Sequence, residues 1–230
     1  MTTLSHIQYV FPISEDSPLA QVYCVHEDLN KKEWKREKFF INKEGKVVAH
    51  FEHPNETIQV ELLSNKREDL FALRYGDEKG WKVVKVLYNG KHEVLANYDD
   101  IEFGEEDGTF AVQKAGLWGF IDIEGNEIIK PQYEKYRAFY NGVAIVRKDG
   151  KCGYINKKGD EITPLKYWHC HPFYDDIAVA ENFDHTSEVI DKSGIVLFKG
   201  KPYQEIYNLG NGSVLVEREN QEFELVKIKE

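Results

Sequence analysis

A short motif that occurs three times gives the first indication of the fold. Residues 119–125 read Gly-Phe-Ile-Asp-Ile-Glu-Gly, residues 153–159 read Gly-Tyr-Ile-Asn-Lys-Lys-Gly, and residues 188–194 read Glu-Val-Ile-Asp-Lys-Ser-Gly. Each copy places β-prone residues before a polar turn that holds an Asp or Asn and closes on glycine. That order is typical of a strand entering a hairpin. The motif therefore predicts a chain built from repeated hairpins.

The turn glycines set the period of the repeat. They lie at intervals of 45, 35, 34 and 35 residues, and they are Gly45, Gly90, Gly125, Gly159 and Gly194. An insertion within 55–68 accounts for the longer first interval. A Tyr, or His53 in the first case, follows each glycine by eight or nine positions, and a second apolar stretch comes later. This self-similarity predicts units of about 35 residues with three short strands, each packed on its neighbours.

We expect one all-β domain over residues 1–230, a tandem array of about five to six three-stranded units. The expected repeat units are 38–80, 81–116, 117–151, 152–185 and 186–216, with 1–37 and 217–230 as partial or capping units. Residues 27–38 are expected to form a loop or one short helix. Pairing of residues 19–25 with 223–228 would close a propeller-like ring. Because the units are shorter than ordinary propeller blades, an open curved array is slightly preferred.

Residues 117–149 carry the densest pattern, with Trp118-Gly119, Pro131, Tyr133 and the apolar run 143–146. This stretch resembles one nearly complete WG repeat of bacterial proteins. The following unit keeps the glycine, as Gly153, but has Cys152 where the Trp would be. The resemblance covers roughly residues 38–216 and is strongest over 117–180. It implies a β-rich tandem repeat, and it brings no general set of catalytic residues.

The composition narrows the class of partner. The chain has 230 residues, with 40 acidic and 30 basic side chains and a net charge of −10. Such a surface repels phosphate, so nucleic acid and anionic membranes are not expected as partners, whereas a basic protein is attracted. No signal peptide and no long apolar run occur. Cys24, Cys152 and Cys170 lack paired spacing and predict free thiols in a reducing, cytoplasmic compartment.

The sequence His169-Cys170-His171 is the sharpest local departure from the repeat. Cys170 occupies a slot that is apolar in other units, so we expect it to be buried. His169 and His171 then point together to the opposite face of a strand. Such a pair can chelate a metal, with Asp175 or Asp176 adding oxygen ligands. The simpler alternative is two exposed polar residues on an outer face.

Several aromatic residues are candidates for the core or for partner binding. Trp118, Phe120, Phe139 and Tyr140 recur at repeat positions and are expected in the core. Three others depart from the pattern and are the partner-binding candidates: Tyr88, Trp168 and Tyr174. Aromatic side chains of this kind often anchor interfaces.

No catalytic constellation is present, because no serine-hydrolase elbow and no glycine-rich phosphate loop occurs. We therefore expect no enzyme activity and no cofactor. The favoured function is a protein-binding repeat module that masks a basic partner such as a toxin, in the manner of an immunity protein. The alternative is a ligand or metal sensor that uses His169 and His171. A cysteine hydrolase ranks last, and the oligomeric state stays open.

Overall fold

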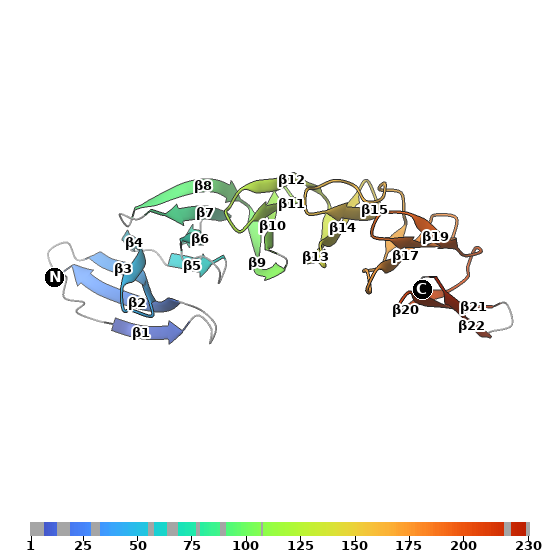
Figure 1. The fold of residues 1–230 in the computed structure, drawn as a ribbon. Coiled ribbons are helices and arrows are strands. Elements are labelled where there is room, and N and C mark those ends of the chain that lie inside the picture. Colours follow the sequence, from blue (N-terminus) through green and yellow to red (C-terminus); the bar gives the residue numbers. More distant parts are fainter. Residues whose placement is uncertain are drawn as a thin grey trace. The chain divides into compact units, whose positions relative to one another are not determined.

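The computed structural model describes residues 7–12, 19–28, 33–54, 58–63, 69–76, 79–87, 91–106, 108–218 and 222–228 (Figure 1). Regular structure in these ranges consists of β-strands alone. Nowhere in them is there a helix with the length and apolarity needed to cross a membrane. The predicted all-β fold class is therefore confirmed.

Within the described residues, twenty-two strands form six sheets, in which strands adjacent in the chain are adjacent in space. The first sheet contains β1 (Ile7–Pro12), β2 (Leu19–Asp28), β3 (Glu33–Asn42) and β4 (Val47–Pro54). The second contains β5 (Ile58–Leu62), β6 (Leu70–Tyr75), β7 (Trp81–Val86) and β8 (His92–Tyr98). The third contains β9 (Asp100–Glu106), β10 (Thr109–Lys114), β11 (Leu117–Asp122) and β12 (Glu127–Tyr133).

The remaining three sheets follow in chain order. The fourth contains β13 (Lys135–Tyr140), β14 (Val143–Lys148) and β15 (Lys151–Asn156). The fifth contains β16 (His169–Cys170), β17 (Ile177–Glu181), β18 (Ser187–Asp191) and β19 (Val196–Lys199). The sixth contains β20 (Ile206–Gly210), β21 (Ser213–Glu217) and β22 (Phe223–Lys227).

None of these sheets closes on itself. Residues 19–25 lie in β2, which pairs with β1 and β3, whereas residues 223–227 lie in β22, which pairs with β21. Each of these two strands therefore finds its partners in its own sheet, in agreement with the expected open array. The chain forms two compact units. The N-terminal unit contains residues 1–115 with 121–127, and the C-terminal unit contains residues 116–120 with 128–230.

The sheets are offset from the sequence repeats. The stretch 117–151 carries four strands, β11 to β14, rather than the expected three. Two of them complete one sheet and two begin the next. Only Glu134 separates β12 from β13, so no turn signal in the sequence marks the break between these strands.

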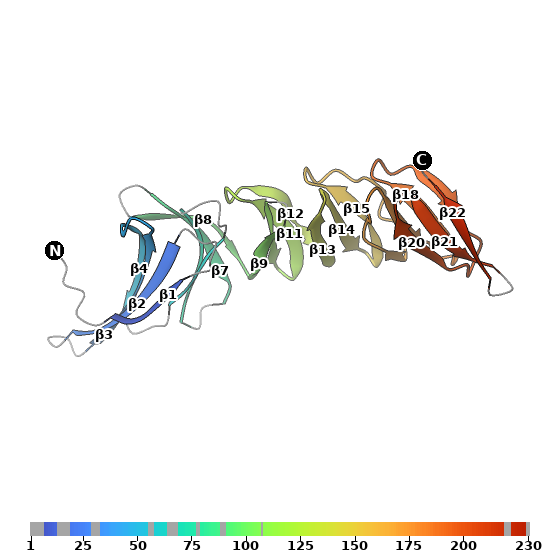
Figure 2. The same cartoon turned by 60° about the horizontal axis from the view of Figure 1, so that its bottom comes forward.

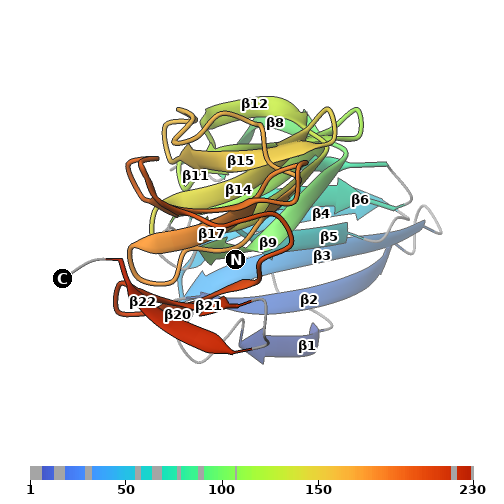
Figure 3. The same cartoon turned by 90° about the vertical axis from the view of Figure 1, so that its right-hand side faces the viewer.

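The expectation of a loop or helix over residues 27–38 is wrong. Residues 27–28 end β2 and residues 33–38 belong to β3, while 29–32 lie outside the described residues. The two strands form a continuous antiparallel ladder from Leu19↔Asn42 to Asp28↔Glu33, which is seen in Figure 3. Pairing along the whole of β2 overrides the weak local preference of this charged segment.

The hairpin turns form as the motif predicts. The Asp122 carboxylate accepts hydrogen bonds from the backbone N–H of Glu124 (2.8 Å) and Asn126 (2.9 Å). Asn156 and Asp191 cap their own turns in the same way. The closing Gly125 has φ +82°, a left-handed conformation that favours glycine. Gly90, which the sequence placed in this series, lies outside the described residues.

In the C-terminal unit the sheets β13–β15, β16–β19 and β20–β22 follow one another (Figures 1 and 2). Apolar side chains from facing strands fill the space between them: Ile177, Val179, Val189, Val214 and Val216 form one such cluster. Both faces of the inner strands are thus covered, which explains the absence of simple alternation in their sequences. Phe120 and Phe139 lie in the core as expected. Trp118 is only half-buried, and Tyr140 is exposed, so its core assignment is wrong.

The glycine of the Trp-Gly motif is required by packing. A Cβ at Gly119 would lie 2.4 Å from the backbone oxygen of Ile129 and 2.5 Å from the backbone nitrogen of Pro131. Real Cβ atoms do not approach backbone this closely, so only glycine allows β12 to lie against β11 here. Gly153 in the next unit is similarly close to Leu165 and to the backbone oxygen of Pro164.

Candidate functional site

A groove in the C-terminal unit is lined by residues from three successive turns. Its volume is about 420 Å³, and its lining residues are Tyr140, Asn141, Tyr174, Asp175, Asn208, Leu209 and Gly210. The groove is open to solvent, and its walls combine two phenol rings, one carboxylate, two side-chain amides and one aliphatic chain. We call this feature the turn groove.

The repeat explains why these residues meet. Tyr140 ends β13 and pairs with Val143, while Tyr174 bridges to Ile177 and Gly210 pairs with Ser213. Each pair encloses a two-residue turn, and the turns begin with Asn141, Asp175 and Asn211, which have φ of 50°, 53° and 51°. Asn and Asp tolerate this left-handed conformation better than most residues. Equivalent turns of consecutive units therefore line one groove.

Polar contacts fix the second and third of these turns to one another. The Asp175 carboxylate accepts a 2.7 Å hydrogen bond from the backbone N–H of Asn211. The Asn208 side-chain amide donates a 2.7 Å hydrogen bond to the backbone oxygen of Ile177. A Cβ at Gly210 would lie 3.0 Å from the Asp175 carboxylate, so glycine permits this close approach. The groove is therefore held in shape by the fold itself.

Two exposed tyrosine rings dominate the surface of the turn groove. Tyr140 is 59% exposed, Tyr174 57% and Leu209 53%. Tyrosine faces attract lysine and arginine cations, and a nearby carboxylate adds a charged acceptor for the same groups. The combination of Tyr140, Tyr174 and Asp175 therefore suits a cationic side chain.

The predicted partner-binding residues fall in three different places. Tyr174 lines the turn groove. Trp168 is 55% exposed and packs its ring against Phe183, with ring centroids 5.6 Å apart. Tyr88 lies outside the described residues. The sequence missed Tyr140, although it stands 34 residues before Tyr174 and directly precedes the equivalent turn.

The predicted metal pair is close but lacks the expected additional ligands. The rings of His169 and His171 lie with centroids 4.7 Å apart, and His171 Nε2 is 3.0 Å from a carboxylate oxygen of Glu181. Asp175 instead bonds to Asn211, and Asp176 is 3.3 Å from Lys192 Nζ. The role of the pair stays a prediction.

The expectation of three free thiols is wrong for two of them. Cys152 and Cys170 are joined by a disulfide, and Cys24 is the free cysteine. The repeat supplies the reason: Cys152 and Cys170 occupy the positions of Trp118 and Tyr136, whose rings contact each other with centroids 4.8 Å apart. Positions that touch in one unit touch in the next. Because reducing compartments break disulfides, the cytoplasmic location stays a prediction.

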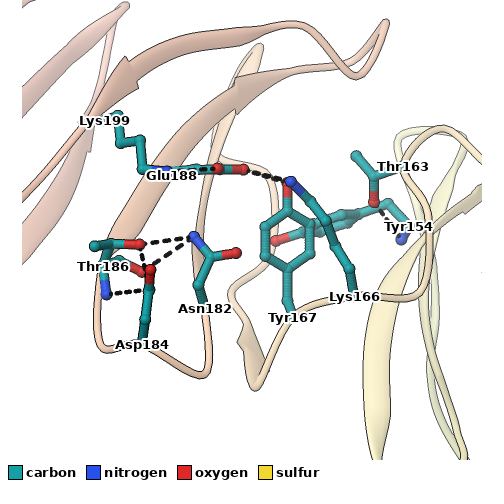
Figure 4. Close-up of polar contacts among 9 residues, drawn as sticks. All are labelled: Tyr154, Thr163, Lys166, Tyr167, Asn182, Asp184, Thr186, Glu188 and Lys199. Atoms are coloured by element: carbon teal, nitrogen blue, oxygen red, sulfur yellow. Dashed lines mark hydrogen bonds and ion pairs between the residues drawn. The ribbon is translucent and has the colours of Figure 1, made fainter. Parts of the chain in front are cut away.

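A buried carboxylate joins two segments of the C-terminal unit (Figure 4). Glu188 accepts 2.9 Å hydrogen bonds from the Tyr167 hydroxyl and from Lys166 Nζ, and Lys199 Nζ is 3.7 Å away. Burial by itself raises the pKa of Glu188, but the hydrogen bonds from Lys166 and Tyr167 outweigh it and hold the pKa below its ordinary value. The Glu188 carboxylate therefore finds its hydrogen-bond partners within the protein, and it connects β18 to the segment that contains Lys166 and Tyr167.

The tyrosines beside Glu188 stay protonated at neutral pH. Burial, reinforced by Glu188, raises the pKa of Tyr167 well above its ordinary value. Burial also raises the pKa of Tyr154, whose hydroxyl donates a 2.7 Å hydrogen bond to the backbone oxygen of His171. Both rings therefore serve as hydrogen-bond donors rather than as reactive phenolates.

Comparison with known proteins supports the repeat assignment. Residues 118–152 and 153–182 match the family model described as WG containing repeat. The resemblance noted from the sequence is confirmed over residues 118–182. No curated protein matches the sequence.

Solved structures with similar folds are distant. The computationally designed Ika8 protein is 13% identical, with 95% of this chain and 70% of that chain covered and a TM-score of 0.36. Kluyveromyces lactis Hsv2 is 11% identical, with 94% of this chain and 72% of that chain covered and a TM-score of 0.35. The C-terminal WD40 domain of Sif2 is 12% identical, with 93% of this chain and 76% of that chain covered and a TM-score of 0.33. TM-scores this low support no inference about function.

Proposed function

We propose that this chain, which matches the WG containing repeat over residues 118–182, is a non-catalytic protein-interaction module that binds a basic partner through the turn groove. The observation that carries the proposal is the exposure of Tyr140 and Tyr174 at equivalent turns, with the Asp175 carboxylate, directly after Tyr174 in the chain, lining the same groove. Large exposed aromatic side chains are typical anchors of protein interfaces.

Charge supports the choice of a basic partner. The net charge of −10 attracts cationic proteins over a distance and raises their rate of association. At contact, a lysine or arginine of the partner would stack on a tyrosine face and pair with Asp175. A toxin that the module masks is one partner of this kind, and a cytoplasmic site of action belongs to that version of the proposal.

The fixed shape of the groove supports recognition rather than chemistry. Asp175 is engaged with the backbone of Asn211, and Asn208 with that of Ile177. Preformed walls lose little freedom when a partner binds, which lowers the entropic cost of association. No histidine, cysteine, serine or lysine is among the residues that line the groove. Calorimetric titration with Zn²⁺ of the native chain and of His169→Ala/His171→Ala tests the sensor alternative, which is based on these two histidines.

The first experiment is a quantitative pull-down from a lysate of the source organism. Three full-length baits are compared: the native chain, Tyr140→Ala/Tyr174→Ala, and Tyr203→Ala. Tyr203 is the matched control because it is 79% exposed but is absent from the groove lining. We expect one basic protein to be retained by the native and control baits and to be lost at least tenfold from the groove variant.

A second experiment uses a defined probe. Fluorescence anisotropy measures binding of a labelled Lys/Arg-rich dodecapeptide and of a Glu-rich dodecapeptide of the same length. We expect the basic peptide to bind more tightly, and its affinity to fall with added salt and with Tyr140→Ala/Tyr174→Ala. Equal binding of both peptides, or full binding by the groove variant, would contradict the proposal.

A further inference from the structure

The N-terminal unit gathers three metal-binding side chains on two paired strands. Glu37 of β3, with His50 and Glu52 of β4, place one ligand atom each within 4.8 Å of one another. Among the described residues no other group of three His, Cys, Asp or Glu side chains is gathered in this way.

Strand register produces the cluster. Glu37 stands directly opposite Glu52, and Phe39 stands directly opposite His50. All four side chains therefore point to the same face of the sheet, because side chains alternate along a strand. The other face carries Phe40, Ala49 and Phe51, which are buried in the core of the unit. The core thus fixes the register that brings the three ligands together.

The cluster is partly buried and its imidazole is held in place. The Glu37 side chain is only 10% exposed, and the His50 side chain is 35% exposed. The His50 ring stacks on Phe39 with ring centroids 4.3 Å apart and parallel planes. His50 Nε2 is buried and forms no hydrogen bond with any described residue. Among the described residues, the carboxylates of Glu37 and Glu52 lie within 4.0 Å of this nitrogen.

The distances between the three side chains suit a shared ligand. Carboxylates directly opposite each other on paired strands repel, so a positive charge between them is stabilising. His50 Nε2 lies 3.5 Å from Glu37 Oε1 and 4.0 Å from Glu52 Oε2. Ligand atoms bound tetrahedrally at about 2.1 Å to one zinc ion stand about 3.4 Å apart.

We propose that Glu37, His50 and Glu52 form a binding site for a divalent transition-metal ion, with Zn²⁺ as the best-matched probe. One imidazole nitrogen and two carboxylate oxygens suit borderline metals such as zinc better than calcium or magnesium, which prefer oxygen alone. Three protein ligands leave a coordination position for water or for a group from another molecule. The site ties β3 to β4 and so stabilises the first sheet.

Calorimetric titration of the full-length, chelator-treated protein with Zn²⁺ tests this site. The variants are His50→Ala and Glu52→Gln, and the control is His169→Ala/His171→Ala, which removes the other histidine pair. Glu52 has a side chain that is 52% exposed, so its substitution leaves the fold intact even where removal of His50 disturbs the Phe39 stack. Thermal unfolding in EDTA checks that each variant is folded.

We expect one Zn²⁺ per chain, at least tenfold weaker binding in both site variants, and unchanged binding in the control. Zn²⁺ should also raise the melting temperature of the native protein and of the control, but not of His50→Ala. Absence of binding by the native chain, or full binding by Glu52→Gln, would overturn the proposal. Loss of binding in the control alone would instead support the His169 and His171 sensor.

Discussion

Reduction of the Cys152–Cys170 disulfide should lower the stability of the C-terminal unit by about 3 kcal/mol. The two cysteines are 18 residues apart in the sequence, so the bond closes a short loop that contains the Tyr167 segment. Opening the loop restores conformational freedom to the unfolded chain. The loop-closure relation gives an entropy of about 11 cal/mol/K for this length, which is about 3 kcal/mol at 25 °C.

The change is measured by thermal unfolding of the native protein with and without dithiothreitol. The variant Cys152→Ser/Cys170→Ser provides the matched control, because reductant cannot alter a bond that it lacks. We expect the reductant to lower the melting temperature of the C-terminal unit by roughly 10–15 °C in the native protein and to leave the variant unchanged. The spectroscopic probe is Trp168, which adjoins β16, the strand that contains Cys170.

A thiol titration of the unfolded, unreduced protein decides whether the reasoning holds. With the disulfide present, only the thiol of Cys24 reacts, whereas a chain with three free thiols yields three. Three reactive thiols, or a reductant effect below about 1 kcal/mol, would refute the argument. It would then follow that the repeat brings Cys152 and Cys170 together without bonding them.

Three further predictions follow from the packing and charge of the two units. The pKa of Glu188 is held below its ordinary value of 4.5, so its contribution to stability is complete above that pH and is lost as the pH falls through the depressed value. Glu188→Gln should therefore lower the free energy of unfolding by about 1–3 kcal/mol at pH 7. The melting temperature of this variant should also fall less than that of the native protein between pH 7 and pH 3. Gly119→Ala should destabilise the protein by about 1–3 kcal/mol in chemical unfolding, because its Cβ meets the backbone of Ile129 and Pro131. Small-angle X-ray scattering tests the expected open array, since a compact chain of this length has a radius of gyration of about 17 Å and an open array must exceed it.

The groove shows where reasoning from the sequence succeeded and where it failed. Tyr174 was predicted to be a surface residue because it departs from the repeat pattern. Tyr140, at the equivalent position, was assigned to the core because it recurs in the repeat. Recurrence marks a structurally equivalent position but does not say whether that position is buried, and the exposure of both residues settles the point.

The β class, the period and the turns could be predicted from the sequence, because these depend on local chemistry. β-Prone strand residues, an Asx cap and a left-handed glycine act within a few residues of one another. Tertiary structure alone decided the turn groove, the Cys152–Cys170 bond and the cluster of Glu37, His50 and Glu52. Each of these depends on strand register or on the contact of consecutive units, which packing of the apolar faces fixes and which no local pattern records.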